Sequence, residues 1–426
     1  MVSAMKPART RIASLLFLVL LSAGVVLLSG CPSEKQTTAV LCTNRPEFTS
    51  YVELFNSAQD EYRLIISYHD TPRRNLSRNS ECEFDLIIDS HLNSQQYLNQ
   101  LASLENLFID KQLEPDRFYA VPLEQGRFDN QQVLLPISFQ IPGLMFHTDR
   151  QLPDQDSFLI DIEQVKSLNE EFSVSTEKGL TRLGLSLRWD PSLLYQISLL
   201  MGADFRESST GSLMWNSESL KNSVDLIRNW TFEINNGLTA EREFTQKFLI
   251  EPPYKLISKE RILCYYTDAE QFYSISPQHR EDLKLRWLAE NDSIPVLPSM
   301  LFAGIPHGAP GIKAAKAFLA WFSDVETQEQ LLASTQYKRT RTFGVAGGFS
   351  ALPRVNEQVL PTYYPSLVGY IPSASYLDFA PPMPSNWPQI RDQVIIPWLE
   401  EQAASEQTDE LMRERLETWL RQRPSS

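Results

Sequence analysis

The chain has 426 residues, of which 42% are hydrophobic and 22% are charged, and its formal net charge is −14 at pH 7. A chain of this composition can bury a sizeable core, and its length indicates two or three domains. The acidic balance argues against nucleic acid as a partner, because binding to phosphates requires clusters of Lys and Arg.

The start of the chain has the pattern of an export segment. A basic beginning is followed by an unbroken run of apolar and small residues from 12 to 28. This run is longer than a typical secretory core and shorter than a typical spanning helix. Two small residues directly precede Cys31, which resembles a bacterial lipobox with residues 1–30 as signal peptide and Cys31 as the lipidation site. The alternative is an uncleaved membrane anchor.

In either case the rest of the chain is expected outside the cytoplasm, held at a membrane and facing the periplasm or the cell exterior. Residues 31–38 form a short polar tether. Cys42, Cys82 and Cys264 remain, and we expect buried, non-functional thiols. A Cys42–Cys82 disulfide is not expected, because the predicted strands would hold the two residues on the order of 20 Å apart.

Behind the tether, short apolar runs alternate with stretches of helical periodicity. Strands are expected at 39–42, 63–68, 84–88, 133–137, 143–147, 262–266 and 300–305. Helices are expected at 47–59, 154–171, 192–201, 217–235, 312–323, 326–334, 397–404 and 408–422. The first part of the chain has a βαβ pattern, which predicts a parallel sheet.

Several short motifs occur in a characteristic order along the chain. They are the strand and helix at 41–56, FDLI at 84–87, LASLE at 101–105, LPI at 135–137, LMFHTD at 144–149, AAKAFLAWFS at 314–323 and the turn at 343–353. Together they resemble the extracellular solute-binding protein family 1, the maltose-binding-protein-like substrate receptors of ABC importers. The resemblance covers nearly the whole chain behind the tether.

The resemblance implies an α/β periplasmic-binding-protein fold with two lobes, hinge strands and a ligand cleft between the lobes. Such proteins close around a ligand by hinge motion. The expected boundaries place residues 39–147 and 269–308 in lobe one, and residues 148–268 and 309–426 in lobe two. The implied partners are a small solute and ABC permease subunits, with no catalysis, no cofactor and no metal.

The cleft is expected among the loops that follow strands, where an open α/β sheet binds its ligands. These loops supply Arg45, Glu47, Asp89, Ser90, Ser138, Gln140, Trp189, Asp190, Tyr266, Asp268, Gly304, Arg341 and Gly344. A sugar needs a flat aromatic surface and a few placed hydrogen-bond partners. Trp189 is the expected aromatic surface, and Asp89 and Asp190 are the expected acceptors.

Each of these assignments has a structural alternative. Trp189 could pack against its own lobe, and Asp89 could cap a helix. Arg45 and Arg341 could bind an anion or could be solvated surface residues. Gly344 could let the backbone approach a ligand or could only complete a turn. The five histidines show no metal-ligand spacing.

The sequence therefore predicts a lipid-anchored solute receptor, with a carbohydrate as the expected solute. A second possibility within the family is a glycerol-phosphate or glycerophosphodiester receptor. NWPQIR at 386–391 is similar to that branch, although Met383 stands where its phosphate-binding Arg is expected. Alternatives from other classes are a surface lipoprotein for adhesion or sensing, and a hydrolase with a carboxylate pair.

Overall fold

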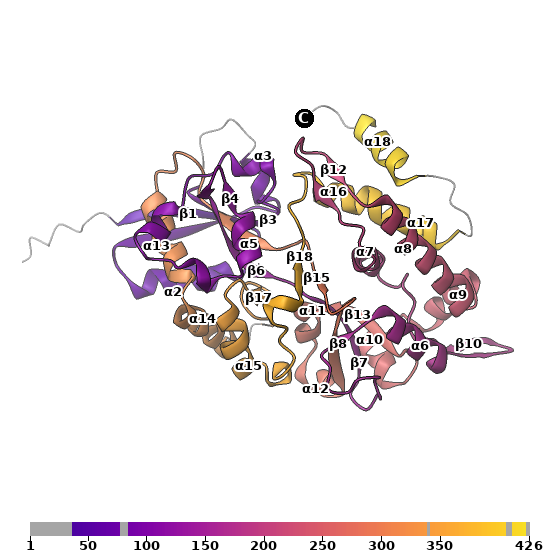
Figure 1. Cartoon of the computed structure of the whole chain (residues 1–426). Coiled ribbons are helices and arrows are strands. Elements are labelled where there is room, and N and C mark those ends of the chain that lie inside the picture. The colour runs from indigo at the N-terminus through magenta and orange to yellow at the C-terminus, as the bar shows by residue number, and fades with distance from the viewer. Residues whose placement is uncertain (1–35, 77–83, 339–340, 406–410, 423–426) are drawn as a thin grey trace, which may run out of the picture.

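The computed structural model describes residues 36–76, 84–338, 341–405 and 411–422, and shows two α/β lobes side by side (Figure 1). The predicted signal peptide, Cys31 and Cys82 lie outside the described residues. Cys42 and Cys264 are buried and free, as expected. Within the described ranges, no helix combines the length and the apolar character needed to cross a membrane.

Lobe one is built on a six-stranded sheet in the order β17-β6-β16-β3-β1-β2. β1 pairs in parallel with β2 and β3, as the βαβ pattern predicts, whereas β16 runs antiparallel to β3 and β6. The strands of this sheet are β1 (Thr37–Thr43), β2 (Tyr62–Tyr68), β3 (Leu86–Ser90), β6 (Leu134–Phe139), β16 (Leu301–Gly304) and β17 (Phe349–Ser350). A small hairpin, β4 (Arg127–Phe128) and β5 (Gln131–Gln132), lies outside it.

The helical elements of lobe one come from three parts of the chain. They are α2 (Phe48–Ala58), η1 (Pro72–Asn75), α3 (Gln95–Leu98), α4 (Glu105–Ile109), η2 (Pro115–Arg117), α5 (Ala120–Gln125), α13 (Ile312–Phe322), α14 (Val325–Tyr337), η4 (Val355–Val359), α15 (Leu360–Tyr363), η5 (Pro365–Leu367) and η6 (Ala374–Tyr376). Here α denotes an α-helix, and η a short 3-10 or π-helix.

Helices α2 and α13 pack on each other beside β1, which corrects the expected domain boundary. Phe48 and Phe55 of α2 recur at helical spacing and are buried. Their rings lie 5.8 Å from Phe322 and 5.4 Å from Phe318 of α13. The segment from residue 309 onward was expected in lobe two, but this aromatic packing places α13 in lobe one. Conversely, the strands at 142–147 and 283–288 were expected in lobe one, but they pair with each other in the sheet of lobe two.

Lobe two is built on a four-stranded sheet in the order β13-β7-β14-β8, and two small hairpins accompany it. Its strands are β7 (Pro142–His147), β8 (Leu159–Ile160), β9 (Val174–Thr176), β10 (Gly179–Arg182), β11 (Arg206–Glu207), β12 (Leu213–Met214), β13 (Cys264–Asp268) and β14 (Leu283–Leu288). Its helices are α6 (Ile162–Phe172), α7 (Pro191–Leu200), α8 (Ser217–Asn229), η3 (Trp230–Ile234), α9 (Leu238–Phe248), α10 (Pro253–Ser258), α11 (Ala269–Ser274), α12 (Pro277–Arg280), α16 (Trp387–Ile390), η7 (Arg391–Ile395), α17 (Ile396–Ala403) and α18 (Met412–Gln422).

Helix α6 begins later than its apolar periodicity suggests. The expected helix at 154–171 starts only at Ile162, because Asp161 and Gln164 form a capping box at this point. The Asp161 side chain accepts a hydrogen bond from Gln164 N, and the Gln164 side chain accepts one from Asp161 N. These two bonds satisfy backbone donors that would otherwise lack partners.

The lobes are joined by crossing segments and by an aromatic contact. β6 continues directly into β7, and β15 (Ile294–Val296) pairs in parallel with β18 (Leu377–Phe379) between the lobes (Figure 1). The ring of Trp287 in lobe two lies 5.6 Å from Phe349 in lobe one, and Tyr273 stacks on Phe343 at 4.8 Å. The core therefore runs continuously from one lobe into the other at this side.

Candidate functional site

Two helices of lobe two begin at neighbouring points, and each begins with an aspartate. Asp190 caps α7 by accepting a hydrogen bond from Ser192 N at 2.8 Å. Asp268 caps α11 by accepting one from Gln271 N at 2.8 Å. Burial raises the pKa of Asp268, and the nearby charge of Asp190 raises it further. The structure thus brings together two residues that are 78 positions apart in the sequence.

An aromatic group lies beside these two carboxylates. Trp189 stacks parallel to Tyr265 at 6.3 Å and to Phe244 at 6.1 Å, and its indole N–H donates to Thr245 Oγ1 at 3.0 Å. Trp189 is half-buried. One part of the Trp189 ring therefore packs against its own lobe, as the structural alternative proposed, and the other part stays accessible beside the carboxylates. Burial and the charge of Asp190 raise the pKa of Tyr265.

The alternation of β13 decides which tyrosine belongs to this group. Tyr265 is half-buried beside Trp189, whereas Tyr266 is only 4% exposed and packs in the core of lobe two. Successive side chains of a strand point to opposite faces. The structure therefore does not support Tyr266 as a ligand contact, and it introduces Tyr265, which the sequence analysis missed.

Glu270, in the first turn of α11, connects the lobe-two carboxylates to lobe one. Gln140 Nε2 donates to Glu270 Oε2 at 3.3 Å and also to the carbonyl of Gly347. Burial raises the pKa of Glu270; the positive charge of Arg45 opposes this rise, and Glu47 and Asp268 add to it. Arg45 and Glu47 lie at the start of α2, so charged groups from both lobes meet here.

Two acceptor atoms at this meeting point are buried without a hydrogen-bond donor. They are Oε2 of Glu47 and Oε1 of Gln140. A buried acceptor without a partner costs free energy, roughly 1–3 kcal/mol for each atom. A ligand that carries hydroxyl or ammonium donors could satisfy both atoms.

Several predicted residues lie away from this group. Asp89 is fully buried in a salt bridge with Arg73 at 3.1 Å, and it also accepts hydrogen bonds from Arg73 N and Ser90 N. Ser138 is 3% exposed within β6. The structure supports neither Asp89 nor Ser138 as a ligand acceptor, because neither side chain is accessible. Ser90 is half-buried at the end of β3.

The two predicted glycines serve the fold of lobe one. A Cβ at Gly304 would lie 2.8 Å from Leu134 and 2.9 Å from Leu101, so this glycine allows close core packing. Gly344 has φ +56°, and a Cβ there would lie 2.1 Å from Gly348 O. The turn by itself accounts for a glycine at position 344. Arg341 is exposed, in agreement with the surface alternative.

A second group of charged residues lies where lobe one meets the C-terminal part of lobe two. It contains His91, Arg73 and Arg391, which were not predicted as site residues. Burial, together with the charges of Arg73 and Arg391, lowers the pKa of His91 to about 3. Arg391, at the start of η7, also acts on the pKa of Tyr195 and Tyr266. It forms an ion pair with Asp392 at 2.8 Å. Arg391 thus approaches lobe one from the C-terminal part of lobe two.

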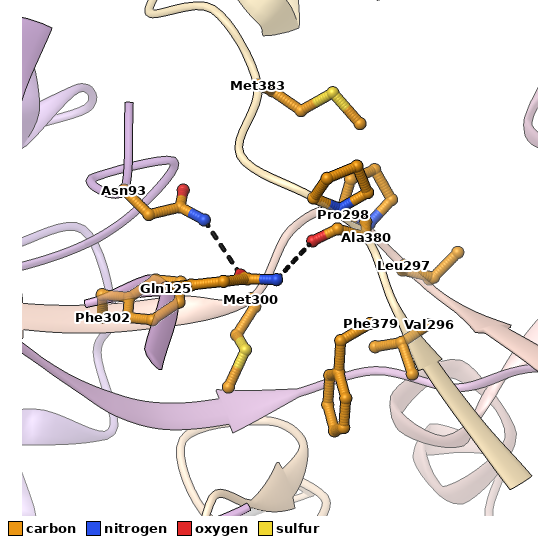
Figure 2. A pocket seen from close by; sticks show the side chains of 11 residues that line it. Asn93, Gln125, Val296, Leu297, Pro298, Met300, Phe302, Phe379, Ala380 and Met383 are labelled. Carbon is orange, nitrogen blue, oxygen red and sulfur yellow. Dashed lines mark hydrogen bonds between the residues drawn. The ribbon is translucent and has the colours of Figure 1, made fainter. Parts of the chain in front are cut away.

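A hollow between the lobes is lined by Asn93 and Gln125 of lobe one and by Met383 of the C-terminal segment (Figure 2). Asn93 donates to Gln125 Oε1 at 3.1 Å, and Gln125 donates to the carbonyl of Ala380 at 3.0 Å. The hollow has a volume of about 10 Å³. Since this is roughly the space of one water molecule, a sugar does not fit in this hollow.

Three larger hollows each take their lining from one lobe. They measure about 560 Å³ beside α6 and η3, about 290 Å³ beside α10 and about 390 Å³ beside α4 and α5. Ring stacking such as that at Trp189 is absent from their described linings. No group of three or more metal-binding side chains occurs among the described residues.

No family model and no curated protein matches this chain. An ABC substrate-binding protein from Listeria monocytogenes, in complex with cycloalternan, is 12% identical over 90% of this chain and 97% of its own, with a TM-score of 0.63. A cyclic alpha-maltosyl-1,6-maltose binding protein from Arthrobacter globiformis is 13% identical, covering 90% and 96%, with a TM-score of 0.61.

A sugar transporter from Rhizobium etli in an open conformation is 12% identical, covering 89% of this chain and 98% of its own, with a TM-score of 0.62. Identities at this level show a shared fold. The three structural matches confirm the two-lobe α/β architecture that the sequence resemblance implies.

Proposed function

We propose that this protein is the extracytoplasmic substrate-binding component of an ABC importer for a carbohydrate. The observation that carries the proposal is the group at the lobe boundary, where Trp189 and Tyr265 lie beside the carboxylates of Asp190 and Asp268. Glu270 of the same group interacts with the charge of Arg45 in lobe one. Aromatic faces match the apolar faces of a sugar ring, and carboxylates accept hydrogen bonds from its hydroxyls.

The proposed mechanism is capture followed by closure, without bond chemistry. A saccharide enters between the separated lobes and stacks on the accessible part of Trp189. Its hydroxyls donate to Asp190, Asp268 and Glu270, and the lobes then close about the crossing strands. A ligand that binds only the closed arrangement stabilises it, and the stabilisation grows with the ratio of the ligand concentration to Kd. The cycloalternan bound to the Listeria neighbour supports the carbohydrate class.

A thermal-shift screen tests this function on the full chain. The panel contains malto-oligosaccharides, manno-oligosaccharides, cyclic glucans and glycerophosphodiesters. At a concentration 100 times Kd, a ligand adds about 2.7 kcal/mol to the free energy of unfolding, so a saccharide is expected to raise Tm by several degrees. A shift with glycerophosphodiesters alone would contradict the carbohydrate assignment, and no shift with any compound would contradict the receptor function.

We further propose that a lipid on Cys31 holds the receptor near its permease at the membrane. The change Cys31→Ser is expected to release the protein into the soluble fraction and to leave saccharide affinity unchanged, since Cys31 precedes the first strand. Retention of the Cys31→Ser protein in the membrane fraction would contradict lipidation at this residue.

A further inference from the structure

The hairpin β11–β12 of lobe two places one carboxylate on lobe one. Glu207 Oε1 accepts a hydrogen bond from Ser94 Oγ at 3.1 Å, and Glu207 Oε2 accepts one from Gln95 N at 3.0 Å. The two partners lie more than 110 positions earlier in the chain. Both oxygens of a single lobe-two side chain are therefore used across the lobe boundary.

Lobe two and its C-terminal segment fix the position of Glu207. Glu207 pairs with Leu213 in the hairpin, and its backbone N–H donates to the carbonyl of Pro382 at 2.8 Å. The backbone that carries the carboxylate is thus bonded to the hairpin of lobe two and to the C-terminal segment. Burial raises the pKa of Glu207, while its hydrogen bonds from Gln95 and Ser94 oppose the rise, so this contact is partly withdrawn from water.

The lobe-one segment 93–96 makes further polar contacts at the same flank. Ser385 Oγ donates to Gln96 Oε1, and Asn93 reaches the carbonyl of Ala380 through Gln125 (Figure 2). Three consecutive residues of lobe one, 94–96, are therefore bound directly by β11 or by the segment that follows the crossing strand β18, and Asn93 is linked to that segment through Gln125.

The polar contact of Glu207 with segment 93–96 and the aromatic contact of Trp287 with Phe349 differ in what their separation costs. Separating Trp287 from Phe349 would expose apolar surface to water, which is unfavourable. Separating Glu207 from Ser94 and Gln95 replaces protein hydrogen bonds by hydrogen bonds to water, and the net cost is small. The aromatic contact is suited to stay closed, and the polar contact is suited to open and reform.

We infer that Glu207 is an interlobe latch, a positioning residue that holds the two lobes together at the flank of 93–96 and thereby sets ligand affinity. The effect on affinity rests on the proposed receptor function, whereas the effect on lobe separation does not. A latch of this kind raises the fraction of molecules with the lobes together, and apparent affinity rises with that fraction.

The distance between the lobes tests the latch directly. Spin labels are attached to cysteines introduced at Asn99 in lobe one and Ser209 in lobe two, both exposed, in a Cys82→Ser background. Glu207→Ala is expected to shift the distance distribution toward longer separations. Glu207→Gln keeps one acceptor oxygen and is expected to restore most of the shorter population. Glu243→Ala, which removes an exposed carboxylate of α9, is the matched control and leaves the distribution unchanged.

Saccharide binding to the same variants supplies the second readout. Glu207→Ala is expected to raise Kd about fivefold or more, with Tm within a few degrees of the parent and with a smaller rise for Glu207→Gln. An unchanged distance distribution in Glu207→Ala would overturn the latch even if sugars bind. A shifted distribution in a protein that binds no sugar would leave the latch standing and refute the proposed function.

Discussion

The indole ring of Trp189 lies at 13° to the ring of Tyr265, with centroids 6.3 Å apart, and both residues belong to segments that lead into an aspartate-capped helix. The stacked pair and the two carboxylates are thus set by one local arrangement of lobe two. Changing the aromatic pair should affect both the stability of this lobe and its binding of ligand.

Trp189→Ala is expected to lower the free energy of unfolding by about 2–4 kcal/mol, because the stacking and the bond to Thr245 are lost. It is also expected to weaken saccharide binding about tenfold or more. The matched control is Trp321→Ala, since Trp321 is also half-buried and contacts two rings, Phe55 and Phe318. Calorimetric titration of both variants separates the two effects; equal losses of affinity would refute the binding role of Trp189.

Asp89 and Asp190 should respond in opposite ways to the same substitution. Asp89→Asn leaves the Arg73 charge buried without a counter-ion, so it is expected to cost about 3–5 kcal/mol of stability. Asp190→Asn keeps a good helix cap and is expected to change stability by less than about 0.5 kcal/mol. Saccharide affinity should fall only with Asp190→Asn. Urea unfolding measures the stability of both variants, and calorimetric titration measures their saccharide affinity. A loss of affinity in a folded Asp89→Asn protein would show that Asp89 takes part in ligand binding.

His91 should make the fold sensitive to acid. Burial lowers its pKa to about 3 in the folded protein, whereas the usual pKa is about 6.5. The unfolded state therefore takes up the proton first, so this contribution to stability is complete above pH 6.5 and is lost as pH falls from 6.5 toward 3.

His91→Asn removes this titration and suits the backbone, since residue 91 has φ +59° and asparagine tolerates that region. Between pH 7 and pH 4.5, the parent is expected to lose about 2–3 kcal/mol more stability than His91→Asn. Urea unfolding at the two pH values measures the difference. Parallel losses in both proteins would show that His91 is not held neutral by the fold.

Gly344 and Gly369 offer a paired test of the turn in lobe one. Both have positive φ, but a Cβ at Gly344 would meet Gly348 O at 2.1 Å, whereas a Cβ at Gly369 would meet nothing within 4 Å. Gly369→Ala is expected to cost about 1–2 kcal/mol from backbone strain alone. Gly344→Ala is expected to cost more, because the backbone must also move. Equal midpoints of thermal unfolding would contradict this reading of the turn.

Local patterns were sufficient to predict most strands and the residues that follow them. The apolar run at 39–42 and the alternation at 63–68 predict β1 and β2 within two residues. Trp189 and Asp190 were selected because they precede a helix beginning with Pro191, and Asp268 because it follows a buried strand. The structure brings these three residues together.

Long-range packing could not be predicted in the same way. Asp89 was selected as an acceptor, but its partner Arg73 lies on a 3-10 turn sixteen residues earlier, and no periodic pattern indicates this pairing. The choice between Tyr265 and Tyr266 depends on which face of β13 meets the core. Helix α13 was assigned to the wrong lobe, because its apolar stripe does not specify which sheet it covers.

Hydrogen exchange with and without a saturating saccharide tests the central claim most directly. If sugar binds between the lobes, amide protection should rise in 44–47, 189–192 and 265–271, which come from both lobes. Protection confined to 166–180 and 229–236, around the surface hollow of about 560 Å³ in lobe two, would contradict the proposed site, as would unchanged exchange with every saccharide that raises Tm.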